Sequence, residues 1–113
     1  MLSEMKQTQW PDPATAASDV YKLLLENERV RVFDVSFRPG QKAEMHGHPD
    51  HVIYVLSDYT LNLRFPDGKS QEVSLKAGQT IFMGAGPHAA VNIGKTGGHA
   101  LVVELKEQPK QAM

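Results

Sequence analysis

The chain has 113 residues, of which 41% are hydrophobic and 22% charged, a composition typical of one folded domain. Its 12 Lys and Arg residues nearly balance 13 Asp and Glu residues, which argues against a nucleic acid partner because phosphate binding needs a basic surface. The absence of cysteine excludes disulfides, thiolate metal ligands and thiol nucleophiles. No apolar stretch approaches the roughly 20 residues that span a bilayer, and the N-terminus lacks the apolar core of a secretion signal. We therefore expect a soluble, cytoplasmic protein without a membrane partner.

The first residues differ in character from the rest of the chain. Residues 1–18 hold Gln, Pro and Asp followed by a run of small residues, and they are expected to form an N-terminal arm with little structure of its own, anchored by Trp10. Residues 19–107 are predicted to form one folded domain. Residues 108–113 are predicted to form a C-terminal tail.

Short β-prone runs alternate with turns rich in Gly, Pro, Asn and Asp from residue 20 onward. Alternation with a period of two is clear in 61–65 and 101–105, as in strands with one buried face. The predicted strands cover 21–26, 29–37, 41–48, 51–57, 60–65, 71–75, 80–83, 88–92 and 100–105. Strands at this spacing indicate an all-β, antiparallel sandwich or small barrel.

Three of the five histidines fall within six residues. His46 and His48 are two apart, so on a strand both rings point to the same face. Imidazoles inside a barrel need a polar partner, and a divalent metal ion would supply one. His51 follows a bend and can return on the adjacent strand, while His88 follows a glycine-rich turn. The alternative is a set of solvent-exposed histidines in a polar hairpin with no ligand.

The histidine spacing resembles the two sequence motifs of the cupin family. Gly40, five residues, His46, one residue and His48 match the opening of the first motif. The second motif is matched by a set of four residues, Gly78, Gly86, His88 and Asn92. The likeness spans roughly residues 29–105 and implies a double-stranded β-helix, or jelly-roll, barrel that holds one divalent metal ion.

The resemblance implies that His46, His48 and His88 are metal ligands. His51 stands where the family usually has a metal-binding glutamate, after a shorter gap, and would complete a four-histidine set. Otherwise His51 lies at the rim of the site and Asp50 competes as the fourth ligand. Imidazole ligands favour iron(II) or zinc, with nickel, copper and manganese as alternatives. Two further departures, at Gly84 and Asp58, affect turn geometry only.

Four other residues have roles that their positions in the predicted strands and turns suggest. Glu44 has the parity of His46, so it is the candidate catalytic residue, acting as an acid or base beside the metal or as a ligand. The alternative is a solvated charge near the barrel mouth. Tyr54 is expected in the core or in a subunit contact, Asn92 in a structural role, and His99 on the surface.

The remaining apolar residues predict a largely dry pocket beside the metal. Ala89 and Ala90 are expected to leave room near the ion. The pocket walls are predicted to come from Ile53, Val55, Leu61, Leu63, Phe65, Phe82 and Met83.

Two functions are compatible with such a site. In the first, the resemblance implies a non-haem iron dioxygenase acting on a small enolisable or diketone-like substrate. In the alternative, the protein is a non-catalytic, metal-dependent module that binds or senses a small ligand. A metal-free barrel with a structural role is a third reading. A homodimer is expected in each case, because small cupins commonly pair and exposed edge strands need covering. The N-terminal arm would then cross to the partner.

Overall fold

The computed structural model of the chain describes residues 10–106, and within them it contains one short helix and nine strands. The helix is α2 (Pro13–Ala16). The strands are β1 (Tyr21–Glu26), β2 (Val30–Phe37), β3 (Lys42–His48), β4 (His51–Val55), β5 (Tyr59–Arg64), β6 (Ser70–Leu75), β7 (Thr80–Met83), β8 (Gly86–Asn92) and β9 (Gly98–Leu105). Each corresponds to a predicted strand, and the ends differ by at most two residues.

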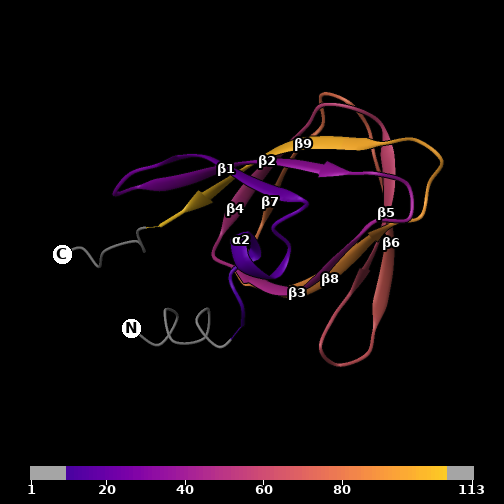
Figure 1. Cartoon of the computed structure of the whole chain (residues 1–113), viewed down its shortest axis with the longest axis horizontal. Helices are drawn as coiled ribbons and strands as arrows, with labels where there is room; N and C mark the ends of the chain where they lie inside the picture. The colour runs from indigo at the N-terminus through magenta and orange to yellow at the C-terminus, as the bar shows by residue number, and fades with distance from the viewer. Residues whose placement is uncertain (1–9, 107–113) are drawn as a thin grey trace.

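The strands form two sheets that face each other (Figure 1). One has the order β1-β2-β9-β4-β7 and the other the order β3-β8-β5-β6, and every pairing between neighbours is antiparallel. Strands from the two ends of the sequence therefore lie side by side, as β2 and β9 do. This arrangement confirms the predicted all-β, antiparallel jelly roll.

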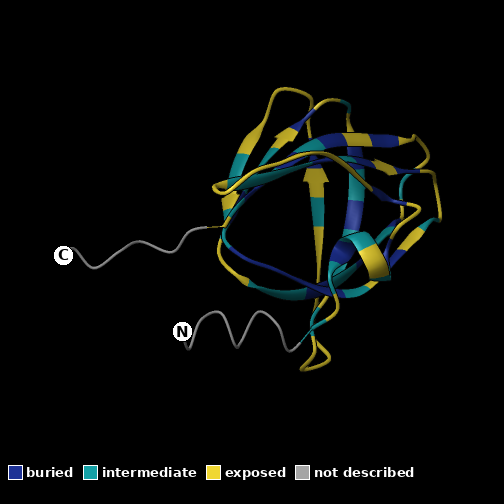
Figure 2. Cartoon of the chain, turned by 60° about the vertical axis from the view of Figure 1, so that its left-hand side comes forward, coloured by how far each residue is buried: buried dark blue, intermediate teal, exposed yellow. Residues whose placement is uncertain are grey.

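The space between the sheets is the core. Buried residues alternate with more exposed ones along β2, β8 and β9, and Figure 2 colours the buried segments dark blue. Phe33 and Val55 are completely buried. Tyr59 packs over Gly98, where an added Cβ would lie 2.2 Å from the tyrosine ring. Glycine at position 98 therefore allows the two sheets to close at this end of the barrel.

The segment before β1 is more structured than predicted. Asp12 accepts a hydrogen bond from the Ala14 amide at 2.9 Å and caps α2, and Pro13 occupies a first-turn position that suits proline. The helix lies beside β3 (Figure 1), and Pro13 and Ala17 are buried. The expectation of little structure is therefore wrong for residues 12–17, because local capping and burial fix them.

The other predictions for the ends of the chain concern residues outside the described range. Residues 1–9 of the arm and the predicted tail at 108–113 belong to this part. Within residues 10–106, no helix is both long and apolar enough to cross a membrane.

Candidate metal centre and adjoining cavity

Strands β3 and β8 bring three histidines together. His46 and His88 are direct cross-strand partners, and His48 lies two residues further along β3 on the same inward face. All three are buried, and one ligand nitrogen from each lies within 4.8 Å of the other two. From His46 to His48 the pairing of β3 with β8 is continuous, so the sheet itself holds these rings in place.

A register shift in β3 decides which side chains accompany these histidines. Ala43 pairs with Ala90 and His46 pairs with His88, so three steps on β3 oppose two on β8, as in a β-bulge. Ala43 and His46 consequently both point inward, while Glu44 is exposed on the outside. The prediction that Glu44 shares the face of His46 is wrong, because the bulge breaks the alternation. Its carboxylate is therefore not beside the histidines.

The opposite sheet contributes His51 through a row of paired residues. Along the inner face, Arg31 pairs with Glu104, Glu104 with His51, and His51 with Met83. The His51 ring lies 4.3 Å from that of His48, measured between centroids. His51 thus approaches the three-histidine cluster from β4.

The hydrogen bonds of the imidazoles fix which nitrogen carries the proton. The Nδ1 atom of His46 faces the carbonyl oxygen of Glu44 at 2.5 Å, and that of His51 faces the carbonyl of Pro49 at 2.8 Å. Since a carbonyl only accepts, each Nδ1 must donate, which leaves Nε2 with a free lone pair. Both Nε2 atoms are buried without a hydrogen-bond partner among the described residues. Such unpaired acceptors are costly, and a metal ion would satisfy them.

Burial also favours the protonation state that binds a metal. It lowers the pKa of His46 and His51, and it lowers the pKa of His48 and His88 well below the ordinary value for histidine. The four rings are therefore neutral near pH 7, the form in which imidazole acts as a ligand. The donor set fits a divalent ion that accepts nitrogen ligands.

A buried carboxylate that the sequence analysis did not select lies behind His48. The Nδ1 atom of His48 donates to Glu104 Oε2 at 2.7 Å, and Arg31 donates to Glu104 Oε1 from Nη2 at 2.9 Å and from Nε at 3.1 Å. Burial raises the pKa of Glu104, and the Arg31 guanidinium opposes this effect. Arg31 also forms an ion pair with Asp12, 3.0 Å from Nη1 to Oδ2. This chain of contacts links the histidine cluster to the cap of α2.

Glu104 had a signal in the sequence. In 100–105 the larger side chains Leu101, Val103 and Leu105 suggest one buried face, but the opposite set of Ala100, Val102 and Glu104 is the buried one. Glu104 alternates with Ala100 and Val102, so it shares their face of the strand. A carboxylate on a buried face needs a charged or hydrogen-bonding partner, and this was the signal for an internal ion pair.

Tyr21 also went unrecognised. It is the one buried residue of β1, and its hydroxyl lies 3.2 Å from His48 Nε2. Its ring packs against His46 at 5.2 Å between centroids. Burial raises the pKa of Tyr21 far above the ordinary value, so the hydroxyl keeps its proton and can donate a hydrogen bond.

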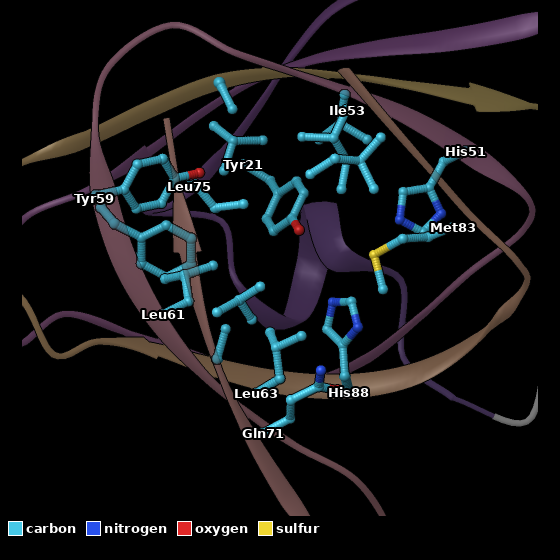
Figure 3. Close-up of a pocket in the computed structure, with 17 residues that line it drawn as sticks. Tyr21, His51, Ile53, Tyr59, Leu61, Leu63, Gln71, Leu75, Met83 and His88 are labelled. Atoms are coloured by element: carbon cyan, nitrogen blue, oxygen red, sulfur yellow. The ribbon is translucent and has the colours of Figure 1, made fainter. Parts of the chain in front are cut away.

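A cavity of about 190 Å³ adjoins the histidines. His51 and His88 lie together on one side of it, and Tyr59, Leu61 and Leu75 lie on the opposite side (Figure 3). The predicted apolar walls are only partly confirmed, since Ile53, Leu61, Leu63, Met83 and Ala90 line the cavity.

Other predicted lining residues lie elsewhere. Phe82 is 61% exposed, because Ile81 and Met83 are the inward residues of β7. Val55 is in the core, Phe65 borders a separate surface hollow, and Ala89 faces the outer side of its sheet.

Tyr54, Asn92 and His99 lie outside the histidine cluster. Tyr54 is exposed, so a core position is wrong and a subunit contact stays a prediction. Asn92 is buried and donates to the carbonyl oxygens of Phe37 and Thr96, which agrees with a structural role. His99 is on the surface, as predicted, and contacts Asp34.

Asp50, the alternative fourth ligand, is engaged elsewhere. Its Oδ1 accepts a hydrogen bond from the Ala85 amide at 2.8 Å, so its carboxylate serves the turn before β8. The geometry therefore favours His51 over Asp50 beside the cluster.

No protein-family model matches the sequence, and no curated protein matches it. Solved structures, in contrast, do match the chain. A cupin domain from Bordetella pertussis Tohama I is 28% identical with a TM-score of 0.72, over 78% of this chain and 93% of that chain. The polyketide cyclase RemF from Streptomyces resistomycificus is 28% identical with a TM-score of 0.58, over 80% and 66%. A double-stranded β-helix protein from Klebsiella pneumoniae is 22% identical with a TM-score of 0.62, over 80% and 75%, and shows the fold alone.

Proposed function

Because the chain has the cupin jelly-roll fold, we propose that it is a metalloprotein whose ion is held by His46, His48 and His88, with His51 as fourth ligand. We propose further that the ion is iron(II) and that the protein is a dioxygenase for a small enolisable or diketone-like molecule. Zinc is the principal alternative metal. The fold alone does not imply the dioxygenase activity, because one fold hosts many functions.

The observation that carries the metal proposal is the orientation of the imidazoles. His46 and His51 each donate from Nδ1 to a backbone carbonyl, which leaves their Nε2 lone pairs for another partner, and His48 donates from Nδ1 to Glu104. The Nε2 atoms of His46 and His51 have no hydrogen-bond partner among residues 10–106. A bound cation explains all of these features together.

The substrate would enter through the adjoining cavity. When bound, an iron(II) ion supplies dioxygen activation and Lewis-acid polarisation of a substrate oxygen. The Tyr21 hydroxyl lies beside the histidines and lines the cavity, so it can donate a hydrogen bond to that oxygen and orient it. The apolar walls exclude water from the substrate. Similarity to a polyketide cyclase, named for a class of molecules rich in carbonyl groups, supports a carbonyl-bearing substrate.

One observation favours the alternative of a non-catalytic, metal-dependent module that binds a small ligand. Glu44, the predicted acid or base, is on the outer face, and no Asp or Glu is among the described residues that line the cavity. Proton abstraction from a bound diketone would then lack a carboxylate base, whereas simple binding needs none.

Metal analysis of protein purified without an affinity tag tests the proposal. We expect one divalent ion per chain, and with iron(II) we expect oxygen uptake when a β-diketone such as acetylacetone is added. One zinc ion per chain without oxygen uptake would support the binding module. Protein that takes up no iron, zinc, nickel, copper or manganese after incubation would contradict both.

The same measurement on His51→Ala tests the fourth ligand. Removing a direct ligand should lower the metal content and the melting temperature of the metal-loaded protein. His99→Ala is the matched control, because His99 is on the surface. If His51→Ala retained the metal content and melting temperature of the parent, the assignment of His51 would be wrong.

A further inference from the structure

We propose that the ligand of the cavity is a molecule about the size of a single substituted six-membered ring, with one polar end directed at the histidines and an uncharged, largely hydrocarbon remainder. This inference rests on the proposed function for the identity of the polar end. The nature of the rest of the molecule follows from the cavity walls alone.

The walls hold no formal charge. None of the described residues that line the cavity is Asp, Glu, Lys or Arg. The aliphatic side chains come from both sheets, for instance Val35 and Val102 from one and Leu61 and Leu75 from the other. Away from the histidines, a charged group on the ligand would lose its hydration without gaining an ionic partner, and this loss is costly.

Three of the five polar side chains that line the cavity are those of Tyr21, His51 and His88, near the proposed metal centre. His51 and His88 lie on the side away from Leu61 (Figure 3), and the Tyr21 hydroxyl is 3.2 Å from Nε2 of the neighbouring His48. The Tyr59 hydroxyl on the opposite side stays protonated, because burial raises the pKa of Tyr59 to about 12. A ligand with a single polar end therefore matches the distribution of polar atoms, with its hydrocarbon part toward the leucines.

The mouth of the cavity is also apolar. The partly exposed lining residues Leu63, Val73, Ile81 and Met83 come from the side where β5 and β6 of one sheet face β7 of the other. Gln71 is the exposed polar residue at this rim. A charged tail extended toward the opening would therefore still cross a hydrocarbon surface before reaching water.

The volume limits the size of the ligand. The cavity measures about 190 Å³, and an apolar cavity of about 150 Å³ in another protein takes up benzene. Nucleotides and sugar conjugates are therefore too large as well as too polar. A small alkyl or aryl ketone fits both limits.

Two ketones of equal size and shape test the role of charge. 4,4-Dimethylpentan-2-one carries a tert-butyl group, and (2-oxopropyl)trimethylammonium carries a trimethylammonium group in the same place. We expect the neutral ketone to bind at least about tenfold more tightly, because the cation must be desolvated among uncharged walls. Affinities are measured by NMR titration of chelator-treated and of zinc-loaded protein. Equal or tighter binding of the cation, held for example against the tyrosine rings, would overturn the inference.

A pair of neighbouring alanines locates the binding site. Ala90 lines the cavity, whereas Ala89 faces the outer side of the same sheet. Ala90→Leu should weaken binding of the neutral ketone at least about tenfold by filling the cavity, and Ala89→Leu should not. Val73→Phe, at the half-buried mouth, gives the same test if Ala90→Leu does not fold. Unchanged affinity in a folded, cavity-filled variant would overturn the inference.

The two proposals fail in different ways. Protein that binds the neutral ketone but takes up no metal contradicts the proposed metal centre and supports the inference about the cavity. Protein that takes up metal but binds neither ketone, in its zinc-loaded form or after chelator treatment, contradicts the inference and leaves the metal centre supported.

Discussion

His48 is the most constrained of the candidate ligands. Its Nδ1 donates to Glu104, its Nε2 lies beside the Tyr21 hydroxyl, and its ring is in contact with those of His46 and His51. A carboxylate that accepts from the far nitrogen of a ligating histidine fixes the tautomer and raises the basicity of the ligand. Glu104 is therefore a positioning residue for the proposed metal centre.

Replacing Glu104 tests this role at the scale of one residue. Glu104→Gln keeps the size of the side chain but removes its charge, so we expect metal affinity to fall about 10-fold to 100-fold. The affinity is measured by titrating zinc against a competing chelator. If Glu104→Asp binds zinc more tightly than Glu104→Gln, the charge of the side chain matters more than its packing.

The control for this variant is Glu72→Gln, an exposed glutamate on β6, which should leave zinc affinity unchanged. A purely structural role for Glu104 would instead lower the melting temperature of the metal-free protein and leave zinc affinity intact. That outcome would refute the positioning role.

At the scale of the elements, cross-strand register assembles the site. Pairing of β3 with β8 places His46 opposite His88, and pairing of β4 with β9 places His51 opposite Glu104. Because side chains alternate between the two faces of a strand, a slip of one residue in either pairing would turn its histidine outward. The bulge between Ala43 and His46 performs such a switch in the native chain.

The short helix α2 is expected to stabilise the same end of the barrel. Asp12 caps α2 and pairs with Arg31, which in turn holds Glu104. Asp12→Ala should lower the free energy of unfolding by about 1–2 kcal/mol through loss of the cap and of a partly exposed ion pair. Urea denaturation of the metal-free protein measures this change. Ser18→Ala, at an exposed position after the helix, is the control, and an equal effect of the two changes would argue against the cap.

At the scale of the whole molecule, the outer face of the five-stranded sheet carries an apolar row. Cross-strand pairing aligns one residue from each strand. The row is Leu25, Val32, Val103, Val52 and Phe82. Its two ends are 50% and 61% exposed, and an exposed apolar surface of this kind is a common site of association.

The homodimer predicted from the sequence is expected to form through this row, because a twofold axis places the same apolar patch on both subunits. Phe82→Lys should convert the dimer to a monomer by placing a charge in the interface. Light scattering coupled to size-exclusion chromatography measures the mass. Ser70→Lys, on the other sheet, is the control. A parent chain that is monomeric at high micromolar concentration would contradict the predicted dimer.

The sequence by itself determined the strands, their turns and the clustering of His46, His48 and His88, because alternation and turn residues act locally and the motif spacing is visible along the chain. Only the tertiary structure decided the roles of Glu44, Glu104 and Tyr21. The bulge turns Glu44 outward, β9 buries Glu104 behind His48, and β1 brings Tyr21 into the cavity. These outcomes depend on the register between strands distant in sequence, and the alternation within one strand contains no information about that register.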